Sequence, residues 1–83
     1  MVEVSFDVEQ AGCESCAARV RGALAPLVSI SALEIDESRD AAIVVGRAAE
    51  EPAVETIDAL LAGASKGAGH AYRVSPGSLR VVG

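Results

Sequence analysis

Aromatic side chains are almost absent from the sequence. Phe6 and Tyr72 are the only two, and there is no tryptophan. The hydrophobic residues, 51% of the chain, are mostly alanine, valine, leucine and isoleucine, so the core must be built by close packing of small aliphatic side chains. A chain of 83 residues lies near the lower size limit for a single core that needs no disulfide. We therefore expect one domain.

The sequence also has no cluster of basic residues and no long apolar run. The formal net charge is −5, and affinity for nucleic acid requires clustered lysine and arginine, so we expect no nucleic-acid partner. No run approaches the ~20 apolar residues of a membrane span. The start Met1-Val2-Glu3 lacks the features of a signal peptide. We therefore expect a cytoplasmic protein that does not insert into the membrane.

The chain has only two cysteines, Cys13 and Cys16. In the cytosol, a lone pair at this spacing more often binds metal or takes part in redox chemistry than forms a structural disulfide. The pair lies where a strand pattern gives way to a helix pattern, which puts both sulfurs on the same side of the first helical turn. Unpaired N–H groups and the helix dipole favour thiolates there. Two thiolates select soft metals, above all Cu(I), a d10 ion that needs no third ligand.

Hydrophobic periodicity predicts two helices and four strands. The strands are expected over residues 2–8, 28–36, 41–46 and 70–75, and the helices over residues 15–25 and 52–63, with Gly12 or Ser15 capping the first helix and Gly63 ending the second. Ile30 is out of phase with Leu33, so a bulge is expected in the second strand.

The element order β-α-β-β-α-β restricts the fold. Crossovers between parallel strands are right-handed, so both helices fall on one face of the sheet. The expected fold is an α+β ferredoxin-like sandwich, with a four-stranded antiparallel sheet. Residues 1–75 form the expected domain, and residues 76–83 are a C-terminal tail that either adds an edge strand or stays loose.

The element order, the C-x-x-C pair at the first loop-to-helix junction and the chain length resemble the heavy-metal-associated domain. That family includes copper chaperones, the N-terminal domains of copper-transporting P-type ATPases and mercury-binding domains. The resemblance extends roughly over residues 2–74, with family-like apolar positions at Val20, Leu24, Ile30, Leu33 and Ile35. Family members usually have Gly-Met and one further residue before the first cysteine. Here these positions are Gln10, Ala11 and Gly12, so the methionine that packs under the metal loop is missing.

The resemblance implies a domain that carries a soft metal and transfers it by thiolate exchange. Cu(I) is the first expectation, with Ag(I), Hg(II), Cd(II) and Zn(II) as alternatives. The implied ligands are Cys13 and Cys16, with Cys13 passed first to the partner. That partner is a metal-transporting ATPase or another soft-metal-binding domain. No catalytic residue is expected, and the protein is expected to be a monomer.

The loop after the second helix leaves two alignments open. If Gly69 matches the family's loop glycine, His70 replaces a frequent tyrosine and becomes a candidate accessory ligand. If Gly63 matches, the loop is an insertion without a metal role. Lys66 in this loop is a candidate for placing positive charge near an anionic bis-thiolate complex.

The sequence is also compatible with two other functions. One is a thiol–disulfide enzyme of thioredoxin type, although the chain is short and Ser15 stands where such motifs often have proline. The other is a structural interaction module whose metal site has lapsed, which the altered residues before Cys13 keep open. Structural zinc is disfavoured because it requires four nitrogen or sulfur ligands.

Overall fold

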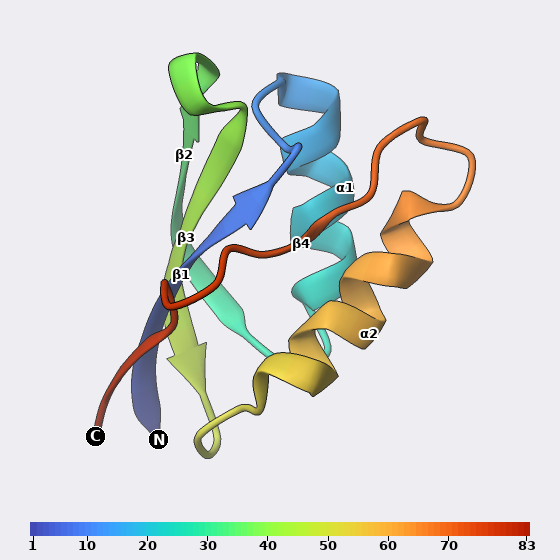
Figure 1. Cartoon of the computed structure of the whole chain (residues 1–83). Coiled ribbons are helices and arrows are strands. Elements are labelled where there is room, and N and C mark those ends of the chain that lie inside the picture. Colours follow the sequence, from blue (N-terminus) through green and yellow to red (C-terminus); the bar gives the residue numbers. More distant parts are fainter.

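The computed structural model describes all residues from Met1 to Gly83. Two helices cover one face of an antiparallel sheet (Figure 1). The elements in chain order are β1 (Val2–Glu9), α1 (Glu14–Leu24), β2 (Ser29–Asp36), the 3₁₀ turn η1 (Glu37–Arg39), β3 (Ala41–Ala48), α2 (Val54–Ser65), β4 (Arg73–Val74) and β5 (Arg80–Val82). The predicted ferredoxin-like α+β fold is confirmed.

The sheet has the strand order β2-β3-β1-β4, and β5 also pairs with β1. β3 runs antiparallel to β1 along its whole length. On the other edge of β1, β4 pairs with Val8 and Glu9, whereas β5 pairs with residues 3–5. β5 thus takes up the part of the β1 edge that the short β4 leaves open, so residues 80–82 of the tail belong to the sheet.

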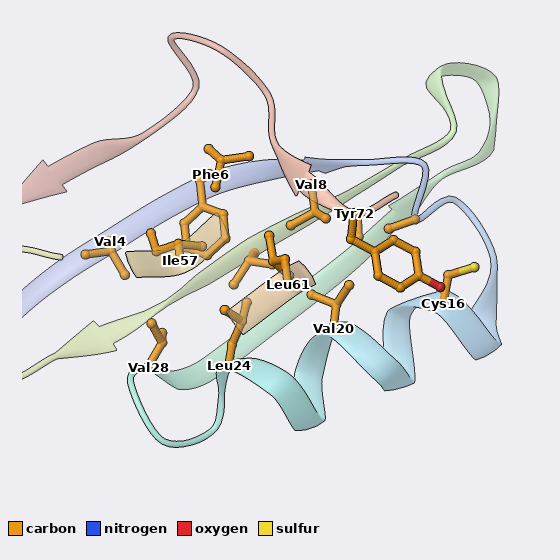
Figure 2. Close-up of a cluster of buried hydrophobic side chains, with 14 of the residues drawn as sticks. Val4, Phe6, Val8, Cys16, Val20, Leu24, Val28, Ile57, Leu61 and Tyr72 are labelled. Carbon is orange, nitrogen blue, oxygen red and sulfur yellow. The ribbon is translucent and has the colours of Figure 1, made fainter. Parts of the chain in front are cut away.

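Buried and more exposed residues alternate along β1, and the buried ones form the sheet side of the core. Val4, Phe6 and Val8 are buried and face the helices, while the residues between them face away from the core. They meet the buried faces of both helices, which contribute Val20, Leu24, Ile57 and Leu61 (Figure 2). Full burial of one such aliphatic side chain contributes about 1.5–3 kcal/mol. A small core without tryptophan therefore holds the two layers together.

Three local features test the expected elements. The bulge in β2 is confirmed as a register shift between Ile30 and Ala32. The predicted stop at Gly63 was wrong, because α2 continues to Ser65. An exposed glycine costs a helix about 1 kcal/mol without ending it, and the buried Leu61 and half-buried Ala64 hold this turn of α2 against the core. The fourth strand is also shorter than predicted, since only Arg73 and Val74 pair as β4.

Three connections gather at one end of the sheet, and both chain termini lie at the other (Figure 1). The first is the loop of residues 10–13 between β1 and α1, hereafter the metal loop. The others are the turn between β2 and β3 and the loop between α2 and β4. No helix has the length and apolar character needed to cross a membrane.

Candidate metal site

The two cysteines lie together at the start of α1. Their Sγ atoms share a hydrogen bond at 2.7 Å, and neither forms a disulfide. Cys13 is exposed on the metal loop, whereas Cys16 is only 3% exposed and belongs to the core cluster. One sulfur is therefore open to an incoming molecule, and the other is held by packing.

Cys13 itself caps α1, so the predicted caps Gly12 and Ser15 were wrong. The Cys16 backbone N–H donates to Cys13 Sγ at 3.4 Å, and Ser15 Oγ lies 3.4 Å from the same sulfur. N-cap preferences, which rank serine, threonine, aspartate and asparagine first, do not point to cysteine. The cap points a backbone N–H that has no partner within the helix at the Cys13 sulfur. This arrangement stabilises a thiolate.

Burial and hydrogen bonding move the pKa values of the two thiols in opposite directions. The pKa of Cys13 is lowered, chiefly by the hydrogen bond with the Cys16 side chain and then by the one with Ser15. The pKa of Cys16 is raised, chiefly by burial and then by its hydrogen bond with Cys13. Cys13 is therefore the more acidic thiol of the pair.

Tyr72 is a neighbour of the sulfurs for which the sequence predicted no role. Its ring is buried, and its hydroxyl lies beside Cys16 (Figure 2). Burial, together with the neighbouring Cys16 side chain, raises the pKa of Tyr72 to about 12. The hydroxyl oxygen is the only buried side-chain nitrogen or oxygen without a hydrogen-bond partner. The sequence signal was present, since a lone tyrosine in a core of aliphatic residues points to a special position.

His70 lies in the loop before β4 and is exposed. Its ring stacks on Tyr72, with ring centroids 6.0 Å apart and an interplanar angle of 12°. No three or more His, Cys, Asp or Glu side chains converge as a metal-binding group. The structure therefore brings together two sulfur donors, and the accessory role of His70 stays a prediction.

Lys66 follows the last residue of α2 and faces a shallow groove of about 470 Å³ between the two helices. Arg19 of α1 lines the same groove, and its floor is made largely of glycine and alanine. Neither cation forms an ion pair, because all the ion pairs of the chain involve Arg39, Arg47 or Arg73. The groove is thus a locally positive surface on an acidic molecule.

Comparisons with known proteins agree with this geometry. The sequence model of the heavy-metal-associated domain matches residues 5–67. Neither the curated proteins nor the solved structures include a significant match to the chain. The family match spans most of the chain, including both cysteines and both helices. Its members are metal-binding modules rather than enzymes. This chain belongs to the heavy-metal-associated domain family.

Proposed function

We propose that this heavy-metal-binding domain carries Cu(I) on Cys13 and Cys16 and passes it to a partner by thiolate exchange. The observation that carries the proposal is the donor set, which consists of two sulfurs 2.7 Å apart with no third ligating side chain. The sulfurs must separate to admit an ion between them, and rotation of the exposed Cys13 side chain can supply this separation without movement of the loop backbone.

The chemistry of the donors supports Cu(I) over the other candidates. Thiolates prefer soft ions, and a monovalent d10 ion is satisfied by two of them. Zinc in a structural site takes four nitrogen or sulfur ligands, and only Cys13 and Cys16 meet here. Ag(I) and Hg(II) share the preference for sulfur, so we expect them to compete for the same pair.

The unequal burial of the two sulfurs supports a sequential transfer. An incoming thiolate reaches the metal on the exposed Cys13 side, because Cys16 is packed into the core. The new metal–sulfur bond forms as the bond to Cys13 breaks, and Cys13 leaves as a thiolate. We propose a metal-transporting ATPase or another soft-metal-binding domain as the acceptor.

An anaerobic titration with Cu(I) against a chromophoric chelator tests the proposal. Wild-type protein is expected to take up one Cu(I) per chain under excess chelator, and both Cys13→Ser and Cys16→Ser are expected to lose this tight binding. Ser31→Ala is the control, because this exposed hydroxyl donates to the Val45 backbone oxygen in the sheet and does not contact either sulfur. Tight binding in both cysteine variants would rule out the assignment. Insulin reduction at the rate of a thioredoxin would favour the redox function instead.

A further inference from the structure

The metal loop is held by unusual backbone geometry. Only two non-glycine residues have positive φ, Gln10 at 60° and Asp40 at 51°. Gln10 begins the metal loop, and Asp40 contacts it from the turn between β2 and β3. The left-handed region costs most L-residues about 1–2 kcal/mol, with aspartate among the more tolerant. Such conformations persist where surrounding structure enforces them, and they cluster at functional sites.

Asp40 holds the metal loop through two hydrogen bonds. Its backbone oxygen accepts from the Ala11 N–H at 3.1 Å, and its Oδ1 accepts from the Gly12 N–H at 3.0 Å. The approach is close enough that a Cβ on Gly12 would lie 2.6 Å from the Asp40 Cα. The residue directly before Cys13 is therefore fixed to the neighbouring turn.

The opposite side of the metal loop is fixed as well. Gln10 Oε1 accepts from the Ala71 N–H at 3.1 Å, which ties the loop to the segment before β4. Ala11 between these two attachments is fully buried. This is the position where the family usually has methionine, so a much smaller side chain packs beneath the loop in this chain.

We propose that Asp40 is a positioning residue for the metal site. Its side chain holds Gly12, and thereby keeps Cys13 Sγ beside Cys16 Sγ, while Gln10 secures the other side of the loop. The inference rests on the proposed function, since it concerns the same two sulfurs. No sequence motif marks Asp40, which lies 28 residues from Gly12 along the chain.

Two substitutions of Asp40 separate its hydrogen bond from its other properties. Asp40→Asn keeps an Oδ1 acceptor and tolerates positive φ, but removes the charge. Asp40→Gly keeps the backbone conformation and removes the acceptor. We expect Asp40→Gly to weaken Cu(I) binding on the order of 10-fold, as loss of a supporting residue around a metal site typically does. Asp40→Asn is expected to keep wild-type affinity, which a role based on charge would not predict.

Amide hydrogen exchange in the metal-free protein provides a readout independent of metal. The Gly12 amide is expected to be protected in wild type and in Asp40→Asn, and to exchange faster in Asp40→Gly. The control is Glu37→Ala, which removes a carboxylate from the same turn without any side-chain bond to the metal loop. It should leave both exchange and affinity unchanged.

The outcomes distinguish this inference from the function on which it rests. If wild type binds Cu(I) and Asp40→Gly binds equally tightly, the positioning role is overturned and the proposed function stands. Equal losses in Asp40→Asn and Asp40→Gly would also overturn it. If Asp40→Gly does not fold, an unprotected Gly12 amide in wild type still refutes the contact. If wild type binds no Cu(I), the proposed function itself fails.

Discussion

Burial and hydrogen bonding give chemically identical side chains in the site different acidities. Cys13 and Cys16 have the same thiol, yet the pKa of the exposed one is lowered and that of the buried one is raised. The spacing in the sequence was enough to predict that they meet. The helical spacing also places Cys16 on the apolar stripe of α1 with Val20 and Leu24, whereas the depth of its burial depends on how α1 packs on the sheet. The position of Tyr72 beside Cys16 has the same origin.

Titration of Tyr72 tests this effect of burial on a single group. As the only tyrosine, in a chain without tryptophan, it can be followed by tyrosinate absorbance. We expect its midpoint near pH 12 rather than near the ordinary value of 10.0. Because the folded state raises this pKa, the stability linked to the neutral hydroxyl is present below pH ~10 and is lost as pH rises toward 12.

Two controls complete the titration. Tyr72→Phe should abolish the absorbance change, and circular dichroism recorded alongside should show that the fold is lost within the same alkaline range. An ionisation near pH 10 in protein that is still folded would contradict the burial of the hydroxyl beside Cys16.

Helices and strands followed the hydrophobic periodicity, whereas their ends depended on side-chain contacts that periodicity does not report. The alternation along β1 and the helical periodicity of α1 and α2 are local, and they correctly predicted one strand and two helices. The sulfur cap of α1 and the continuation of α2 past Gly63 were not. Position 12 is a further example of a feature that local patterns do not report. It requires glycine because the Asp40 backbone lies close to it, and Asp40 is remote in sequence.

A pair of glycine substitutions tests whether contacts between elements or local propensity decides stability. Gly12→Ala is expected to lower the free energy of unfolding by about 1–3 kcal/mol, because the new Cβ meets the Asp40 backbone and the loop and turn must separate. Gly22→Ala, in α1, meets nothing within 4 Å and is expected to raise it by up to ~1 kcal/mol through helix propensity.

Urea denaturation monitored by circular dichroism measures both changes. If the two alanine variants shift stability in the same direction by similar amounts, the close approach of Gly12 to Asp40 does not govern the loop.

The molecule as a whole carries a charge of −5, but its charge is unevenly distributed. Arg19 and Lys66 flank the groove between α1 and α2 and have no acidic partner. The Cys16 side chain lies on the same helix, one turn before Arg19. A partner that approaches Cys13 with acidic residues on its own surface would meet complementary charge here, which accelerates association.

Charge reversal tests this arrangement. We would measure Cu(I) transfer to two synthetic C-x-x-C peptides, one with acidic flanks and one with neutral flanks. Wild type is expected to transfer faster to the acidic peptide at low salt, with the preference fading as salt rises. The double variant Arg19→Glu/Lys66→Glu should lose this preference. Arg21→Glu/Arg80→Glu changes the net charge equally, outside the groove, and should retain most of it. Equal loss in both variants would indicate a general charge effect.

Local patterns in the chain were sufficient for the order of the elements, the fold class and the meeting of two cysteines at a helix start. Periodicity and short spacings carry that information, because they depend on neighbours within one or two turns. The assembled sheet alone decided how deeply Cys16 is buried, that Tyr72 lies beside it, and that Asp40 holds the metal loop. Those contacts join residues far apart in sequence, such as Gln10 and Ala71. They arise only when packing of the two helices on the sheet brings three separate connections to one end of the molecule.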